Sequence, residues 1–250
     1  MPARGLVTES LINVPTLIAM AIACLAGIIR GITGFGGSMV MTPPLALLFG
    51  PQLAVAAVLL LEAFAGAPMM VDAARKATWR VLAPIALAAF VTVPLGGYVL
   101  VHADQDLLRR AIAAVVFIFA LLLLKGARYT GARGLPSSVA LGALSGTMLG
   151  ATGIGGPPVV LYLLSGPDSM RVTRANLTLY VALISVAGLT MLASRGILNT
   201  ASVTTSLLLA PPFFIGVLVG TGLFAHFSDV RFRQFTLVLL LAVSIGILFA

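Results

Sequence analysis

Charged residues are scarce in this sequence of 250 residues. Its 15 basic and 7 acidic residues make up 9% of the chain, whereas charged residues form about 25% of a typical soluble domain. Hydrophobic residues make up 60%, and the mean hydropathy is +1.14. A soluble α-domain would need a charged surface that so few residues cannot supply. The composition therefore excludes a soluble domain and indicates an integral membrane protein.

Cysteine and histidine are also rare. Cys24 is the single cysteine and lies in an apolar run, so the chain cannot form an internal disulfide or a thiolate metal site. His102 and His226 lie in polar turns, and no group of His, Cys, Asp and Glu has the spacing of a metal site. We therefore expect no metal and no cofactor. An intramembrane enzyme is disfavoured, because the sequence shows no nucleophile with a partnered base at membrane depth.

The basic residues are spread in groups of one to three between apolar runs. The net charge of +8 and the pI of about 10.8 would suit nucleic acid, but no basic patch is formed, so we expect no nucleic-acid partner. Residues 75–80, 125–133, 171–174 and 231–233 hold ten of the 15 basic residues. If these segments share one side of the membrane, the positive-inside rule makes that side cytoplasmic and places both termini outside.

A glycine-rich motif followed by two prolines occurs twice, as GITGFGG at 31–37 with Pro43 and Pro44, and as GATGIGG at 150–156 with Pro157 and Pro158. Ordinary helix preferences exclude so many glycines and prolines, so each copy predicts a helix break. The apolar segments that follow, over 38–48 and 157–164, are too short for a hydrocarbon core of about 30 Å. Each should be a half-helix or a re-entrant piece.

The second half of the chain repeats the pattern of the first, as a tandem duplication would. Each half has one helix, one short broken helix and three full spans, with a Gly-Pro pair after the short helix. We expect an all-α, polytopic membrane protein of two inverted repeats, 1–125 and 139–250, joined by a loop at 126–138. The first run continues into the motif without the polar region of a signal peptide, so we expect it to be retained. The apolar runs lie at 11–29, 52–71, 81–101, 111–124, 139–149, 175–193, 203–225 and from 235 onward.

The duplicated Gly-x-Gly-Gly element, at 34–37 and 153–156, with its prolines and Gly-Pro pairs, resembles the TauE/SafE sulfite exporter family, also called the toluene sulfonate uptake permeases. The resemblance covers nearly the whole chain. It implies a secondary transporter in a bacterial inner membrane that moves a small sulfur-containing anion, such as sulfite, sulfoacetate or an organosulfonate, with ion coupling. The second copy has Pro157 where the first has Ser38, so the two copies need not contribute equally.

The two motifs form the predicted anion site. A helix interrupted in the membrane exposes backbone N–H groups, and the N-terminus of the next half-helix carries about half a positive charge. Two inverted copies would direct two such ends at one point in the midplane, where glycines allow close approach and hydroxyls donate hydrogen bonds. The alternative is that these glycines only let helices pack closely. The expected binding residues are Thr33, Gly34, Gly36, Gly37, Ser38, Thr152, Gly153, Gly155 and Gly156.

Three further polar residues are candidates for this site. Arg30 precedes the first motif and has Leu149 as its counterpart, so it is either the counter-charge of the anion or an arginine that extends to the interface. Asn176 follows a Gly-Pro pair and either lines the cavity or marks the start of a helix. Glu62 lies in the middle of an apolar run, where a carboxylate is rare. It either couples transport to protons or gates the substrate, or it is a protonated structural acid that is hydrogen-bonded to a neighbouring helix.

These observations favour a carrier whose halves rock around a central site in the lipid bilayer, with protons as the candidate coupling ion. An anion channel or a structural membrane subunit is the alternative, because neither of these needs a saturable site that is exposed to the two sides in turn.

Overall fold

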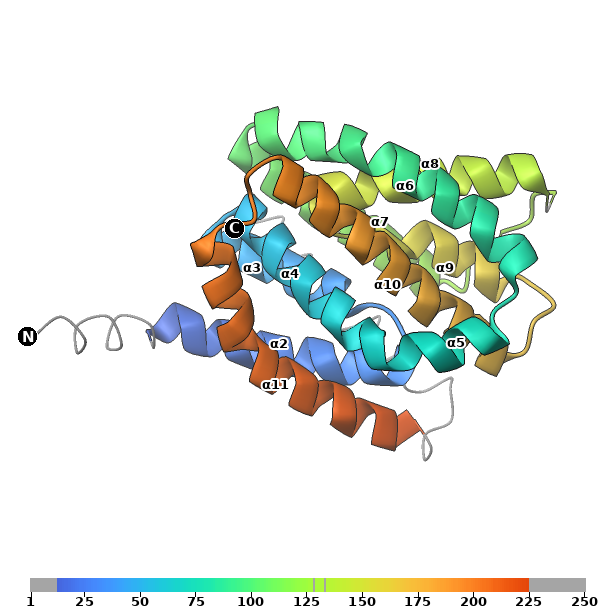
Figure 1. Ribbon diagram of the computed structural model, residues 1–250, viewed down its shortest axis with the longest axis horizontal. Helices are drawn as coiled ribbons and strands as arrows, with labels where there is room; N and C mark the ends of the chain where they lie inside the picture. Colours follow the sequence, from blue (N-terminus) through green and yellow to red (C-terminus); the bar gives the residue numbers. More distant parts are fainter. Residues whose placement is uncertain (1–12, 128, 133, 225–250) are drawn as a thin grey trace, which may run out of the picture.

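The computed structural model describes residues 13–127, 129–132 and 134–224 (Figure 1). Within these ranges the chain is all-helical, so the predicted fold class is confirmed. The first half forms α2 (Val14–Thr33), α3 (Gly37–Phe49), α4 (Pro51–Gly66), the 3-10 turn η1 (Ala67–Met69), α5 (Met70–Lys76), α6 (Trp79–His102) and α7 (Gln105–Leu124). The second half forms α8 (Leu135–Thr152), α9 (Gly156–Leu164), α10 (Met170–Ser194) and α11 (Thr200–Phe224).

Four of the described helices are long and apolar enough to cross a membrane, namely α2, α6, α10 and α11. Together, α4 and α5 would make a fifth span, but they are bent by 70°. The predicted span over 52–71 is therefore bent after Gly66. Pro68 lacks the N–H that an α-helix needs, and η1 interrupts the helix there. The predicted turn at 226–233 and the final span from residue 235 lie outside the described residues.

The connection between the two halves is shorter than predicted. The helix α8 begins at Leu135, although the sequence suggested a start at residue 139. Pro136 lies in the first turn of α8, where a missing N–H breaks no hydrogen bond within the helix. The helix α7 also begins early, at Gln105, so that its first turn extends into the predicted polar turn.

Both predicted helix breaks are confirmed, and both use the same backbone device. The helix α2 ends at Thr33 and α8 ends at Thr152, and each is followed by a glycine in the left-handed conformation. These glycines, Gly34 and Gly153, have φ values of 79° and 71°, which other residues rarely adopt. The prolines differ between the copies: Pro43 and Pro44 lie inside α3, whereas the second pair lies in the first turn of α9.

Each half packs its first helix against the other half. The helix α2 lies along α11, and α8 lies along α6, on opposite sides of α4 and α10 (Figure 1). Glycines make both contacts close, because a Cβ on any of them would collide with a backbone carbonyl oxygen of the partner helix. This packing accounts for the first glycine of each motif, while the inverted relation of the halves stays a prediction. The glycines are Gly27, Gly31, Gly216 and Gly220 in the first pair and Gly96, Gly142, Gly146 and Gly150 in the second.

The central pair, α4 and α10, passes both breaks. On α4, Glu62 lies beside Gly37 of the first break, and Val55 lies beside Gly153 of the second. Seven residues of an α-helix span about 10 Å. The two breaks therefore lie at different levels along α4. They do not meet at one point, although the sequence had predicted that they would. The corresponding neighbours on α10 are Thr178 beside Gly34 and Ile184 beside Gly155.

Candidate functional site

An ion pair holds the first break together. Arg30, in the last turn of α2, donates from Nε to Oε2 of Glu62 on α4 over 2.5 Å, and their side chains are only 3% and 2% exposed. The other carboxylate oxygen, Oε1, accepts the backbone N–H of Ser38 at 3.0 Å. A Cβ on Gly37 would lie 2.5 Å from that oxygen. The carboxylate thus occupies the N-terminus of α3, which is the place where the sequence predicted the substrate anion.

The remaining nitrogens of Arg30 differ in their surroundings. Nη1 donates to the carbonyl oxygen of Gly34, which is left without a helical partner at the end of α2. Nη2 is buried and has no hydrogen-bond partner among the described residues. Because the side chain is buried inside the protein, the alternative that Arg30 extends to the interface is wrong.

Arg174 brings a second guanidinium to the first break. Its Nη2 donates to the carbonyl oxygen of Gly31 at 2.5 Å, and its Cγ would be 2.9 Å from a Cβ on Gly34. Two guanidinium groups and one carboxylate therefore lie at this break. The sequence analysis missed Arg174 as a site residue, because it reaches α2 from a position 143 residues away.

The second break is held by uncharged groups. Ser145 donates from Oγ to the carbonyl oxygen of Gly155, and it accepts a hydrogen bond of 2.6 Å from the Tyr180 hydroxyl. Leu149 stands where the first copy has Arg30. No heavy atom of the described residues lies within 4 Å of the position that a Cβ on Gly156 would take. Sequence reasoning missed Ser145 and Tyr180, since isolated hydroxyls in apolar helices carry no periodic signal.

Each of the two motif threonines forms hydrogen bonds to the backbone before and after it at its helix break. Thr33 donates from Oγ1 to the carbonyl oxygen of Ile29 at 2.8 Å and accepts the N–H of Phe35 at 3.2 Å. Thr152 makes the same pair of bonds in the second copy. A hydroxyl has one hydrogen to donate, so in this conformation the threonines shape the breaks and do not offer a donor to an anion.

Asn176 lies apart from both breaks. It is fully buried on α10, and its Oδ1 accepts the backbone N–H of Thr78, just before α6 begins. This contact satisfies one of the four N–H groups that lack a helical partner at the start of a helix. The predicted site residues that the structure brings together are therefore Arg30, Glu62, Ser38, Gly34 and Gly37.

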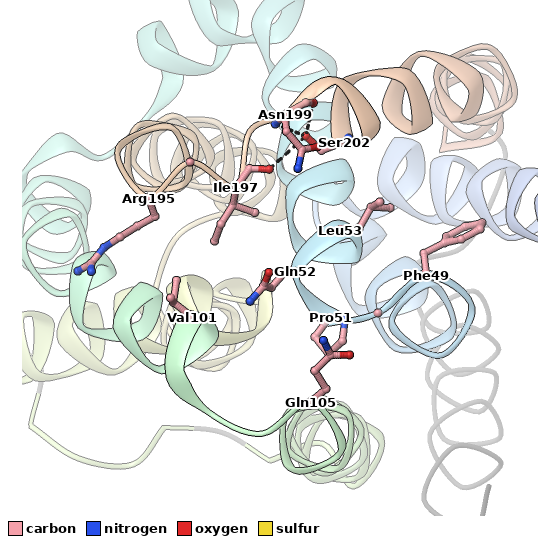
Figure 2. Close-up of a pocket in the computed structure, with 12 residues that line it drawn as sticks. Phe49, Pro51, Gln52, Leu53, Val101, Gln105, Arg195, Ile197, Asn199 and Ser202 are labelled. Carbon is pink, nitrogen blue, oxygen red and sulfur yellow. Dashed lines mark hydrogen bonds between the residues drawn. The ribbon is translucent and has the colours of Figure 1, made fainter.

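A cavity of about 340 Å³ lies at the opposite end of α4 from Glu62 (Figure 2). Gln52 projects between Ile197 and Val101, and Arg195 lies at the edge of the cavity. Val55, which contacts the second break, follows Gln52 by three residues, or about 5 Å along the helix. The cavity is lined by Phe49, Gly50, Pro51, Gln52, Leu53, Val101, Gln105, Arg195, Gly196, Ile197, Asn199 and Ser202.

Comparison with known proteins identifies a family. The family model described as sulfite exporter TauE/SafE matches residues 19–247, which include both breaks. No curated protein and no solved structure is significantly similar to the chain. The family match covers far more than half of the sequence. The chain therefore belongs to the TauE/SafE sulfite exporter family, whose members are membrane transporters of sulfur-containing anions and not enzymes.

Proposed function

We propose that this protein carries a small sulfur-containing oxyanion, of the sulfite, sulfoacetate or organosulfonate class, across a bacterial inner membrane by alternating access. The single observation that carries this proposal is the group of two arginines and one glutamate at the first break. Arg30 pairs with the buried carboxylate of Glu62 at the N-terminus of α3, and Arg174 donates to the carbonyl oxygen of Gly31 at the same break. The first break is therefore our proposed anion site.

The electrostatics of this group favour an anion. Arg30 is a buried cation, and two guanidinium groups at one break place positive charge beside the N-terminus of α3. The N-terminus of α3 adds about half a positive charge and N–H donors. Guanidinium groups bind oxyanions through paired N–H donors, which suits sulfite and sulfonate groups. The second break has no arginine among its described contacts, so we assign it a gating role.

The arrangement of the helices supports alternating access. The cavity at the start of α4 lies about one helical turn from the second break, and the first break lies two turns further along the same helix. An anion would pass the cavity, the second break and the first break in that order, or in reverse. Because each half contributes helices to both sides of α4 and α10, a rocking of the halves would open the two ends in turn.

Glu62 is our candidate for proton coupling. Among the described residues, the ionisable groups near it are Arg30 on α2 and, beyond it, Arg174 on α10, whereas α3 and α11 carry no ionisable side chain. In our proposal, Glu62 exchanges its contact with Arg30 for a proton during the transport cycle.

Counterflow in proteoliposomes tests the transport proposal. Vesicles that contain the purified protein and unlabelled sulfoacetate should take up labelled sulfoacetate with saturation and a transient overshoot, because a carrier exchanges its substrate. Protein-free vesicles are the control. Uptake without saturation or overshoot would identify an anion channel, and the absence of uptake for sulfite and sulfonates alike would favour a structural subunit.

The coupling proposal is tested with Glu62→Gln, which resembles the protonated acid. The variant should still exchange anion between the two sides but should lose accumulation driven by a pH gradient. Asp72→Asn is the matched control, since Asp72 is an exposed acid that pairs with Lys76 on α5. Accumulation by Glu62→Gln at the wild-type rate and extent would assign coupling to another ion.

The orientation is tested with single cysteines in a Cys24→Ser background. Lys76 lies in the basic segment 75–80, which the positive-inside rule places in the cytoplasm. Arg195 lines the cavity, which should open on the other side of the membrane. An impermeant thiol reagent added outside intact cells should label Arg195→Cys and spare Lys76→Cys. The opposite labelling pattern would reverse the proposed orientation.

A further inference from the structure

We infer that Glu62 is an internal substitute for the transported anion, so that the substrate binds by displacing the Glu62 carboxylate from Arg30 and from the N-terminus of α3. This inference rests on the proposed function. It adds that the Glu62 carboxylate competes with the substrate, and that the site prefers anions with three oxygens to carboxylates. It follows from which donors the carboxylate uses and which donor it leaves unused.

The carboxylate of Glu62 holds the donors that an oxyanion would use. It takes Nε of Arg30 with one oxygen and the N–H of Ser38 with the other. The Arg30 donor is buried and the Ser38 donor is partly buried, and the carboxylate carries the same single negative charge as a sulfonate. A substrate anion cannot bind these donors while Glu62 keeps them. The site is therefore competent only in the fraction of molecules in which Glu62 has moved away.

A carboxylate leaves one donor of this group unused. Nη2 of Arg30 is buried without a partner among the described residues, although it lies on the same edge of the guanidinium plane as Nε. Guanidinium groups bind oxyanions through such paired donors. Two carboxylate oxygens cannot give each of Nε, Nη2 and the Ser38 N–H an acceptor oxygen of its own. The three oxygens of a sulfite or sulfonate group can. The donor set thus favours an anion with three oxygens over a carboxylate.

The second copy of the motif lacks each part of this arrangement. Leu149 replaces the arginine, and Pro157, which has no N–H, stands in the position of Ser38. The residue equivalent to Ser38 can therefore be proline without loss of the helix break, since α9 begins at the corresponding glycine. This natural difference supplies a substitution, Ser38→Pro, that removes one donor from the first break and is compatible with the first turn of a helix.

If the ion pair is purely structural, a neutral residue at position 62 should have the opposite effect on anion affinity. If the pair only ties α2 to α4, its loss should loosen the site and weaken anion binding. If Glu62 is a competitor, its neutralisation should tighten binding, because the apparent dissociation constant is the intrinsic constant divided by the competent fraction of molecules. A competent fraction of about one tenth corresponds to about tenfold tighter binding in the variant.

The test is equilibrium binding to the purified full-length protein, measured by titration calorimetry with methanesulfonate and with acetate. The two probes are monoanions of similar size with three and two oxygens. Glu62→Gln should bind methanesulfonate about tenfold more tightly than the wild-type protein. Added to Glu62→Gln, the change Ser38→Pro should weaken methanesulfonate binding about tenfold, because the anion loses a charge-assisted hydrogen bond while no carboxylate competes for it. Ser38→Ala, which removes the hydroxyl and keeps the N–H, measures the share of the side chain, and Asp72→Asn controls for loss of an acid elsewhere.

The wild-type protein supplies a readout that needs no variant, since methanesulfonate should bind more tightly than acetate. Equal or weaker methanesulfonate binding by a folded Glu62→Gln protein would overturn the inference, and so would equal affinity of the wild-type protein for both probes. In either case saturable binding and counterflow by the wild-type protein would leave the proposed function intact. Failure of both proteins to bind either probe would overturn the inference, and counterflow would then decide whether transport uses another site.

Discussion

The two helix breaks end their first helix in the same way and differ in their chemistry. Each ends a helix at a threonine, continues through a left-handed glycine and starts a second helix three residues after that glycine. The first is surrounded by Arg30, Glu62 and Arg174, whereas the second is held by Ser145 and Tyr180. A broken helix in a membrane therefore does not define an anion site by itself. The side chains that neighbouring helices bring to the break decide what it can bind.

Even glycines at equivalent positions are required for different reasons. Gly36 has φ of 89°, so a side chain there would be strained by the backbone. Gly155 has φ of −109°, and a Cβ there would lie 2.9 Å from both the Ser145 carbonyl oxygen and the Leu149 Cβ. Gly36 is thus needed for the turn and Gly155 for close packing. A valine at either position would disturb folding as well as transport.

The largest effect is expected from Arg30→Leu. This change gives the first break the residue that the second break has at the equivalent position, Leu149. The variant leaves the Glu62 carboxylate buried without its partner, which costs about 3–5 kcal/mol in the free energy of unfolding. Transport should be lost. The double variant Arg30→Leu, Glu62→Leu should recover most of the stability, because an apolar pair can replace a buried ion pair, but it should not recover transport.

Denaturation of the purified variants and counterflow in proteoliposomes measure these two properties separately. Transport by the double variant at the wild-type rate would remove the ion pair from the anion site and make the two breaks equivalent in function.

The next largest effect is expected from alanine at the third glycine of Gly-x-Gly-Gly. Gly37→Ala would place a Cβ 2.5 Å from Oε1 of Glu62 and should push the carboxylate away from the Ser38 N–H. The unfolding free energy should fall by about 1–3 kcal/mol, since a buried donor loses its partner. Gly156→Ala is the matched control in the second break, where no described atom lies within 4 Å of the new carbon. It should change stability by less than about 0.5 kcal/mol.

Thermal unfolding of both variants, together with their uptake rates, tests this difference. Equal sensitivity of the two positions would show that the breaks are crowded to the same degree.

A smaller effect is expected from the hydroxyls of the second break. Ser145→Ala removes a group that both donates and accepts, so the Gly155 carbonyl and the Tyr180 hydroxyl each lose a partner. We expect a loss of about 2 kcal/mol for Ser145→Ala and about 1 kcal/mol for Tyr180→Phe, with the affinity for the anion unchanged in both. Denaturation and anion titration measure these effects. A large loss of anion affinity in either variant would assign binding to the second break as well.

The smallest effect is expected at the cavity. Arg195 is exposed at its edge, where a charge acts on the arrival of anions more than on their final affinity. Arg195→Gln should lower the uptake rate about twofold at low ionic strength, and the difference should disappear at about 1 M salt, where the Debye length is about 3 Å. A decrease in uptake that persists at high salt would indicate direct binding at Arg195.

Local signals made several features predictable from the sequence. The scarcity of charge excluded a soluble fold, and the glycine motifs placed both breaks, because left-handed glycines end helices wherever they occur. The end of α4 at Gly66 was missed, although Pro68 is a local signal, since the apolar run continues past it. Hydropathy records whether a segment is apolar, and it does not record whether the segment is straight.

The sequence by itself determined the membrane class, the helix breaks and the importance of Arg30 and Glu62 as charges in an apolar chain. Only the tertiary structure decided that these two residues pair with each other, that Arg174 joins them, and that Ser145 and Tyr180 hold the other break. These contacts join residues that are 32, 143 and 35 positions apart. Hydrophobic periodicity specifies which face of a helix is buried, but the crossing of two helices decides which polar groups meet on those faces. Because a buried polar group must find its partner there, the chemistry of each break was settled by helix packing and not by the motif.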